Sequence, residues 1–159
     1  MAIGLVGSEM CIRDSMKGYW RNDDATAECI NSEGWFKSGD LGKFDGPFLY
    51  ILDRLKDMVI RGGENIACPE VEGAIYEHPD VLEASVFGIP DERLGEILCS
   101  SICLREGSKL SVESLNEFLS DKLAAFKIPV KIKFTYNPLP KIASGKFDKP
   151  TMRQNFIEE

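Results

Sequence analysis

The alternation of strand-like and helix-like segments after about residue 55 limits most strongly what this chain can fold into. Three segments rich in β-branched and apolar residues are typical of strands, and they span residues 81–90, 96–105 and 131–136. Pro69 opens a helix pattern that reaches about Glu77, and Ser111 is a suitable N-cap for a second, amphipathic helix. Because helices separate most of the strands, the pattern predicts a small α+β domain with a three-stranded sheet.

A glycine pair marks a β-hairpin just before the first of these helices. The run LKDMVIRGGENIACP predicts two short strands that turn at Gly62 and Gly63, since glycine accepts the positive φ angles of a tight turn. Upstream, residues 34–54 predict two further strands around an Asp-Gly-Pro turn. We therefore expect residues 16–54 to be the end of a larger domain and residues 55–159 to form a small domain of their own.

The first fifteen residues, MAIGLVGSEMCIRDS, fit poorly with the rest of the chain. Their apolar run is too short for the core of a signal peptide, and no basic flank precedes it. The segment resembles translated sequencing-adapter read-through. We expect residues 1–15 to be a leader foreign to the fold, the alternative being a native terminus with little order.

Charge and cysteine content argue against several classes of function. The net charge of −7 argues against nucleic acid as the main partner, although residues 127–153 carry seven cations and one anion, which suits a small polyanion. The five cysteines form no CxxC pair and the only histidine, His78, has no ligand partner nearby, so no metal site is predicted. An odd cysteine count without a secretory signal favours reduced thiols and a cytoplasmic location. No apolar run approaches the roughly 18 residues of a membrane span.

The segment NPLPKIASGKFDKP, residues 137–150, presents one lysine in a stiffened loop. Its three prolines leave the backbone fewer states to lose on ordering. Gly145 can take a positive φ and turn the chain just before Lys146, and Pro150 begins a short helix pattern. The arrangement fits a cation aimed at an anionic ligand, and it also fits an ordinary solvated lysine.

Three further clusters each admit a functional and a purely structural explanation. In SGDLG, Asp40 offers two acceptor oxygens to a vicinal diol such as ribose, or serves as a turn residue. The charge run DRLKD, residues 53–57, is typical of a solvated linker. The paired glycines of IRGGEN permit close backbone approach to a ligand, or simply the turn of a hairpin.

In this order and spacing, the motifs closely resemble the carboxyl-terminal part of the adenylate-forming superfamily. They are GWFKSGDLG, LDRLKDMVIRGGENI, PEVE and PLPKIASGKFDK. The superfamily includes acyl-CoA synthetases, luciferases and peptide-synthetase adenylation domains, and RGGENI and VFGIPDERLGE are most similar to its fatty-acid and medium-chain acyl-CoA ligase branch. The resemblance runs from about Gly18 to Arg153. It implies a small C-terminal lid domain preceded by the last strands of a larger AMP-binding domain.

The resemblance also implies roles for residues at the junction of the two domains. Asp40 matches the ribose-binding aspartate of the family, and Arg54 matches a second group near the same ribose and phosphate. Lys56 falls at the hinge position, where backbone rotation swings the lid between two orientations. Gly63, with its neighbours Gly62 and Glu64, matches the lining of the tunnel through which CoA enters.

Lys146 matches the catalytic lysine of the family's first half-reaction. The resemblance implies that its ammonium bridges the carboxylate substrate and the α-phosphate of ATP. Carboxylate attack on the α-phosphate brings two anions together, so a positioned cation offsets their repulsion. Removing one such preorganised group typically lowers the rate by about 10²–10³.

The resemblance implies ATP with Mg²⁺, a carboxylic acid of the fatty-acid class and CoA as substrates, with no bound prosthetic group. The sequence has no Ser/Thr/Gly-rich phosphate loop, so we expect a fragment of a ligase that is inactive without the missing N-terminal domain, which also sets the acid class. The alternative is a freestanding, non-catalytic module that binds a nucleotide, CoA or a carrier protein through its basic tract. The ribose and hinge motifs favour the fragment, because a binding module has no use for them.

Overall fold

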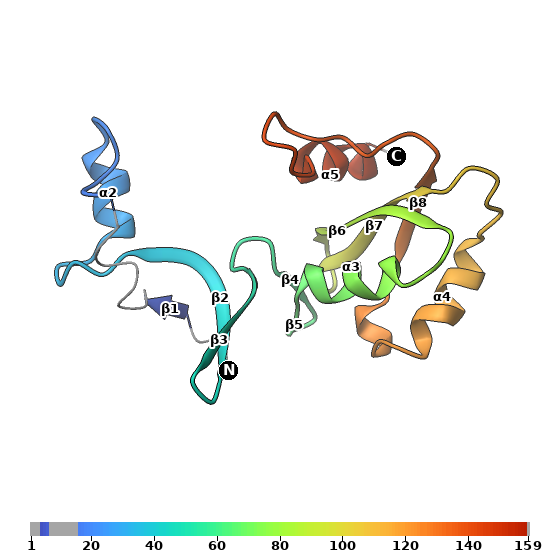
Figure 1. Cartoon of the computed structure of the whole chain (residues 1–159), viewed down its shortest axis with the longest axis horizontal. Coiled ribbons are helices and arrows are strands. Elements are labelled where there is room, and N and C mark those ends of the chain that lie inside the picture. The colour runs from blue at the N-terminus through green and yellow to red at the C-terminus, as the bar shows by residue number, and fades with distance from the viewer. Residues whose placement is uncertain (1–3, 7–15, 159) are drawn as a thin grey trace. The chain divides into compact units, whose positions relative to one another are not determined.

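The computed structural model describes residues 4–6 and 16–158, and the chain divides into two compact units, Met1–Lys56 and Asp57–Glu159 (Figure 1). The first unit contains an antiparallel sheet in the order β1-β2-β3. Its elements are β1 (Gly4–Val6), α2 (Asp23–Cys29), β2 (Lys37–Asp45) and β3 (Phe48–Arg54). Both strands predicted within residues 34–54 are present, and they turn at Gly46, whose φ is 57°.

Helix α2 is an addition to the strands that the sequence predicts here. The side chain of Asn22 caps it by accepting a hydrogen bond from the backbone N–H of Ala25 at 3.0 Å. Asp23 and Asp24 place negative charge in its first turn, where the helix dipole favours it. The helix has no buried residue, so capping and charge define it rather than an apolar face.

The predicted leader, residues 1–15, lies largely outside the described residues. Its described part, Gly4–Val6, forms β1 and pairs with β2. The expectation that residues 1–15 are foreign to the fold therefore stays a prediction.

The second unit follows the predicted alternation of helices and strands, and the α+β class is confirmed. The Pro69 helix, the Ser111 helix and the terminal helix are all present. The elements are β4 (Val59–Arg61), β5 (Glu64–Ile66), α3 (Cys68–Tyr76), β6 (Val81–Asp91), β7 (Gly95–Leu104), α4 (Val112–Ser120), a 3₁₀ turn (Ala125–Lys127), β8 (Lys131–Thr135) and α5 (Lys149–Ile157).

The glycine-pair hairpin is part of the main sheet of this unit. Strands β6, β7 and β8 pair as the three expected strands, and β4 joins them because Arg61 pairs with Gly95 at the start of β7. The sheet thus has five strands in the order β5-β4-β7-β6, with β8 beside β7. The pairing of β8 with β7 is parallel, and α4 with the 3₁₀ turn supplies the crossover that a parallel pair needs.

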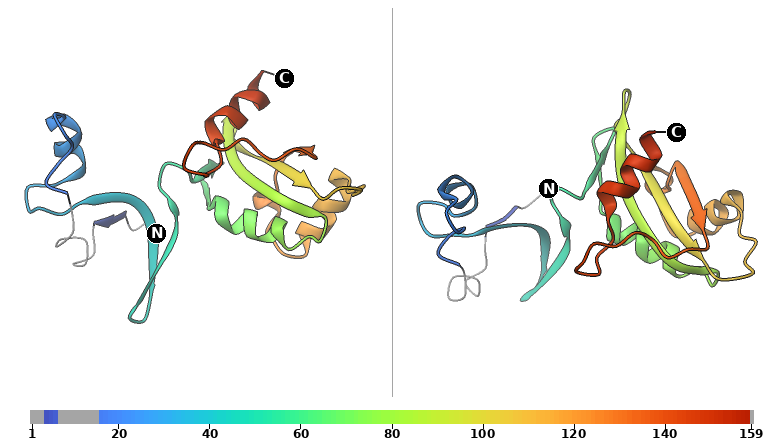
Figure 2. Two further views of the ribbon diagram at one scale, coloured as in Figure 1. Left: turned by 45° about the horizontal axis from the view of Figure 1, so that its top comes forward. Right: turned by 90° about the horizontal axis from the view of Figure 1, so that it is seen from above.

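Two apolar clusters cover opposite faces of this sheet. Alternate residues of a strand face opposite sides, so Ala84 and Val86 join the cluster beneath α3 and α4, while Phe87 and Ile89 join the cluster beneath α5. Figures 1 and 2 show α3 and α4 on one face and α5 on the other. The loop before α5 contributes Leu139 to the second cluster.

Candidate functional site

Lys146 lies on a tight hairpin within residues 137–149, here called the lysine strap, which follow β8 and end at the first residue of α5. The N–H of Ile142 donates to the carbonyl of Lys146, and the N–H of Gly145 donates to the carbonyl of Ile142, both at 2.9 Å. Gly145 has a φ of 83°, the left-handed conformation that closes a three-residue hairpin loop. The glycine that the sequence places before Lys146 thus makes the turn that presents it.

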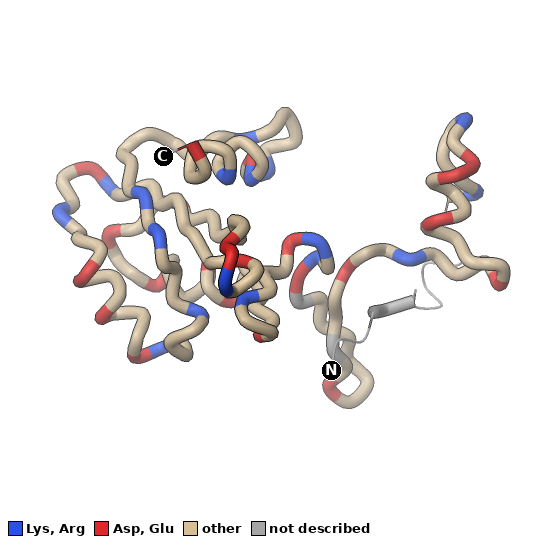
Figure 3. The backbone as a smooth tube through the Cα atoms, turned by 180° about the vertical axis from the view of Figure 1, so that it is seen from behind, with Lys and Arg blue, Asp and Glu red and all other residues tan. Residues whose placement is uncertain are grey.

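The Lys146 side chain is exposed, whereas other cations of the basic tract are paired. Within residues 4–6 and 16–158, no ion pair or side-chain hydrogen bond of Lys146 is formed. Figure 3 shows where the cationic and anionic residues lie along the chain. Three lysines of the tract form ion pairs with carboxylates of the same unit: Lys127 with Glu70, Lys141 with Glu83, and Lys149 with Glu72. Three of the seven cations of the predicted basic tract are therefore neutralised internally.

The structure adds Glu72 and Glu83 to the residues around the strap. The sequence predictions did not include them, because no local pattern marks a carboxylate whose partner lies far along the chain; Glu83 and Lys141 are 58 positions apart. The hydrogen bond from Lys141 is the main reason that the pKa of Glu83 lies below its ordinary value of 4.5, and the N–H of Leu139 adds to the effect while burial opposes it.

In the first unit, Asp40 and Arg54 lie directly opposite one another on β2 and β3. Arg54 Nε is 3.5 Å from Asp40 Oδ1, and the arginine side chain is 54% exposed. Such an open ion pair contributes little to stability, so both groups can rearrange around an incoming ligand. The Asp40 N–H also donates to the hydroxyl of Ser38 at 3.1 Å. Both residues lie within β2, so Asp40 is a strand residue and not the turn residue that the sequence allowed.

Lys56 and Arg54 line one hollow of the first unit. It has a volume of about 460 Å³ and is formed by Tyr19, Ser38, Gly39, Arg54, Leu55 and Lys56. The N–H of Leu55 donates to the carbonyl of Gly39 at 2.8 Å, which holds the end of β3 beside Asp40. The predicted hinge residue is thus adjacent to the predicted ribose site, and its own side chain is exposed.

Gly62 and Gly63 form the two-residue turn of the β4–β5 hairpin. Their φ values are 58° and 88°, a combination that strongly favours glycine at both positions. A Cβ on Gly62 would lie 3.3 Å from Leu94 Cδ2, whereas one on Gly63 would meet nothing within 4 Å. Gly63 and its neighbour Glu64 are exposed, so this turn is open to a ligand.

The two units divide the predicted site residues between them. Asp40, Arg54 and Lys56 belong to the first unit, while the Gly62–Glu64 turn and Lys146 belong to the second. His78, the only histidine, packs edge-to-face on Phe118 with ring centroids 4.9 Å apart. In the part of the chain that the structure describes, no group of three or more His, Cys, Asp or Glu residues could hold a metal ion. No helix there is both long and apolar enough to cross a membrane.

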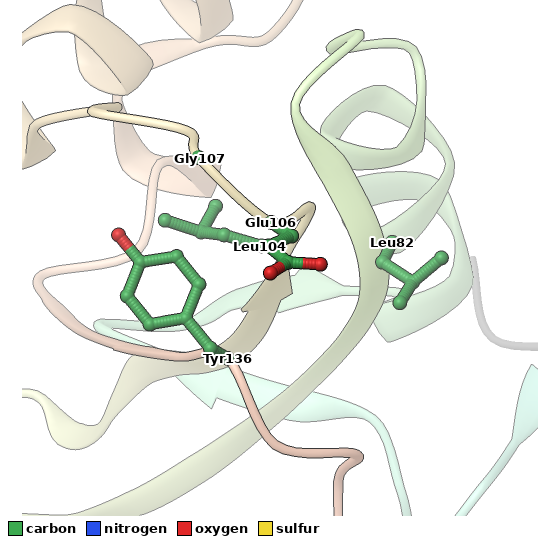
Figure 4. A pocket seen from close by; sticks show the side chains of 5 residues that line it. All are labelled: Leu82, Leu104, Glu106, Gly107 and Tyr136. Carbon is green, nitrogen blue, oxygen red and sulfur yellow. The ribbon is translucent and has the colours of Figure 1, made fainter.

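A second hollow, of about 650 Å³, lies apart from all the predicted site residues. It is lined by Leu82, Leu104, Glu106, Gly107 and Tyr136 (Figure 4). The Tyr136 hydroxyl donates to the carbonyl of Ser108 at 2.8 Å, which fixes the ring at its edge. Nothing in its lining corresponds to the predicted chemistry.

Comparison with known proteins agrees with the fold and with the motifs. Residues 70–146 match the family model described as the AMP-binding enzyme C-terminal domain. Among curated relatives, a feruloyl-CoA synthase of Amycolatopsis is 42% identical over 142 residues, which cover 89% of this chain and 28% of that protein. A medium-chain acyl-CoA ligase of Danio rerio is 40% identical over 141 residues, covering 87% of this chain and 23% of that protein.

A solved structure gives the same result. The crystal structure of ATP-bound MatB from Rhodopseudomonas palustris matches with a TM-score of 0.81 at 35% identity, over 88% of this chain and 28% of that one. The chain thus spans less than a third of each of these proteins. The residues that match the family model begin within α3, contain β6, β7, α4 and β8, and end at Lys146. This chain belongs to the adenylate-forming enzymes and carries their AMP-binding C-terminal domain.

Proposed function

We propose that this chain supplies the C-terminal part of a fatty acid–CoA ligase. In the complete enzyme, a carboxylate would attack the α-phosphate of ATP, supplied with Mg²⁺, to form an acyl-adenylate and release pyrophosphate. The acyl group would then pass to the thiol of CoA with release of AMP. The observation that carries the proposal is the exposed, unpaired Lys146 on a fixed hairpin, in a chain whose relatives are CoA ligases. The name of the Danio rerio relative, a medium-chain acyl-CoA ligase, supports the fatty-acid class.

In the first half-reaction, Lys146 would supply the cation between the carboxylate and the α-phosphate. Both reactants are anions. The ammonium stabilises the transition state most strongly if it already lies where negative charge accumulates. A lysine fits this task because its charge is compact and its stem is long. Asp40 would accept hydrogen bonds from the ribose hydroxyls of ATP. Arg54, beside it, would contact the ribose or the phosphate. Their adjacent positions on β2 and β3 support this pairing of roles.

In the second half-reaction, the lid would rotate about Lys56. The rotation would withdraw Lys146 and present the Gly62–Glu64 turn to the pantetheine arm of CoA. The boundary between the compact units falls directly after Lys56, which supports this residue as the hinge. The openness around Gly63 supports the turn as a lining of the CoA path.

The remainder of a large AMP-binding domain is the expected partner of the first unit. The β2–β3 hairpin exposes large apolar side chains, among them Phe44 at 63%, Phe48 at 65% and Ile51 at 60%. Exposed apolar side chains in this number are typical of a segment that packs against further protein. Cys29, Cys99 and Cys103 are free thiols, which supports a reducing compartment, and we propose a cytoplasmic location.

The alternative, a non-catalytic module that binds through its basic tract, has less support. Lys127, Lys141 and Lys149 are engaged with carboxylates of their own unit, so three of the tract's seven cations are already neutralised. The Asp40–Arg54 pair and the exposed Lys146 serve a ligase directly.

A chimeric enzyme tests the proposal. Residues 16–159 replace the matching segment of the Amycolatopsis feruloyl-CoA synthase, and ATP–pyrophosphate exchange and feruloyl-CoA formation are measured separately. Lys146→Ala should lower exchange by about 10²–10³ while thioester formation from supplied feruloyl-adenylate persists. Lys56→Pro should show the reverse pattern, and Lys109→Ala, which removes another exposed lysine, should change neither. Normal exchange in Lys146→Ala would reject the proposal.

A further inference from the structure

The lysine strap is tied to the body of its unit by an ion pair on each side of the Lys146 hairpin. On the N-terminal side, Lys141 pairs with Glu83 of β6. On the C-terminal side, Lys149 Nζ lies 3.0 Å from Glu72 Oε1 of α3. The hairpin that presents Lys146 therefore lies between two anchors that come from different elements.

Each anchoring carboxylate is itself held by a backbone N–H. Glu83 accepts from the N–H of Leu139 at 2.8 Å, so it holds the strap by a backbone and a side-chain contact together. Glu72 accepts from the N–H of Val86 on β6, also at 2.8 Å. A carboxylate with two donors in defined directions has little freedom to swing away, and charge-assisted hydrogen bonds are the stronger kind.

Burial of the carboxylate distinguishes these two pairs from the pairs of Lys122 and Lys127 in the same unit, although Lys141 itself is 40% exposed. The side chains of Glu83 and Glu72 are 19% and 18% exposed. Those of Glu70 and Glu77, which pair with Lys127 and Lys122, are 49% and 61% exposed. Screening by water weakens the exposed pairs, so the two strap pairs are the ones expected to fix geometry.

The anchors also select which lysine meets a ligand. Lys141, Lys146 and Lys149 all lie within nine residues of one another, and a free ammonium at any of them could approach an incoming phosphate. The two carboxylates neutralise Lys141 and Lys149, which leaves Lys146 exposed and unpaired among these three. The same contacts that fix the hairpin thus prevent Lys141 and Lys149 from competing with Lys146 for an anionic ligand.

We propose that Glu72 and Glu83 are positioning residues for Lys146: they clamp the strap on both sides of its hairpin and neutralise the neighbouring lysines. The inference rests on the proposed function of Lys146. Both carboxylates are occupied by a strap lysine and a backbone N–H, so each would act on the reaction only through the strap.

The clamp is tested first in the full chain, without reference to activity. Hydrogen exchange is followed by NMR at the amides of Ile142 and Gly145, whose bonds close the hairpin. Glu83→Gln and Glu72→Gln should each speed exchange at these amides by about tenfold, while core amides of β6 and β7 keep their rates. Glu70→Gln, which removes the charge of an exposed pair from the same helix as Glu72, should change neither set.

Two further variants guard against a general loss of folding. Lys141→Met and Lys149→Met remove the ammonium from the other side of each pair and keep most of the apolar stem. They should speed hairpin exchange as the glutamate variants do. Unchanged hairpin exchange in all four variants, or equal acceleration in the core and the hairpin, would overturn the clamp.

The link to catalysis is tested in the feruloyl-CoA synthase chimera with a double-mutant cycle. Glu83→Gln should lower kcat for pyrophosphate exchange about tenfold with little change in KM for ATP, and Glu83→Asp should restore part of it. In a Lys146→Ala background, Glu83→Gln should have no further effect, because it acts through that lysine. An equal effect in both backgrounds would overturn positioning. Lack of any effect of Lys146→Ala would instead reject the proposed function and leave the hydrogen-exchange result standing.

Discussion

Replacing Leu139 with alanine tests whether the lysine strap is part of the folded core. Leu139 is 5% exposed and belongs to the cluster beneath α5, although it lies in a loop. Buried leucine-to-alanine changes cost about 2–5 kcal/mol, depending on how far the site can collapse. Because a loop can move inward more easily than a strand, we expect the lower part of that range, about 2–3 kcal/mol.

The assay has to report on the second unit alone. Both tryptophans, Trp20 and Trp35, lie in the first unit, so their fluorescence would follow the wrong transition. Hydrogen exchange at the slowest amides of β6 and β7 reports the opening of the second unit. With about 1.4 kcal/mol per factor of ten, Leu139→Ala should speed that exchange by about 30- to 150-fold.

Leu82→Ala is the matched control. Leu82 lies on β6 and is 50% exposed. Its truncation therefore loses only part of the free energy gained by removing a leucine side chain from water, and it leaves no closed cavity. We expect a cost below about 1 kcal/mol. If Leu139→Ala and Leu82→Ala accelerate exchange equally, the strap is not packed as the structure indicates, and the argument that it holds Lys146 in place fails with it.

Two further predictions concern ionisable groups of the described residues. Burial raises the pKa of Cys99 to about 11, so only about 0.1% of this residue is thiolate at pH 8. Iodoacetamide should therefore label the half-buried Cys29 long before Cys99, as peptide mapping would show. Equal labelling rates would contradict this prediction. Lys141 holds the pKa of Glu83 below 4.5, so the carboxylate stabilises the strap above that pH and the contribution disappears as the pH falls through the lowered value. Hairpin protection should therefore be level from pH 7 to 5 and decline only below 4.5, and Glu83→Gln should make the decline smaller.

Local patterns were sufficient for most of the second unit. Ser111 accepts a hydrogen bond from the N–H of Ser114 at the start of α4, as an N-cap should. The Gly62–Gly63 turn and the alternating strands follow from rules that involve only near neighbours. These features were predictable because the residues that determine them are adjacent in sequence.

The features that the sequence did not predict depend on distant pairing or lack an apolar signal. The hairpin joins the sheet through Arg61 and Gly95, and nothing in either segment specifies that partner. Helix α2 buries no residue, so hydrophobic periodicity could not indicate it. Glu83 accepts a hydrogen bond from the N–H of Leu139, which is 56 positions away in the sequence. Among the site residues, Lys146 was predictable from its turn, whereas the carboxylates that would hold it were not.

A firmly held strap restricts how Lys146 could leave an active site. Its backbone is tied to the second unit by a buried leucine, two ion pairs and a closed hairpin. Local opening of the strap would break all of these contacts, whereas rotation at Lys56 breaks none of them. Withdrawal of the lysine should therefore involve the whole unit. The two kinds of variant should then separate in the chimera: Lys56→Pro should impair thioester formation, and Glu83→Gln should impair adenylation. If both variants impaired the same half-reaction, the positioning of Lys146 and its withdrawal would depend on the same part of the structure. The assignment of the withdrawal to rotation at Lys56 would then be wrong.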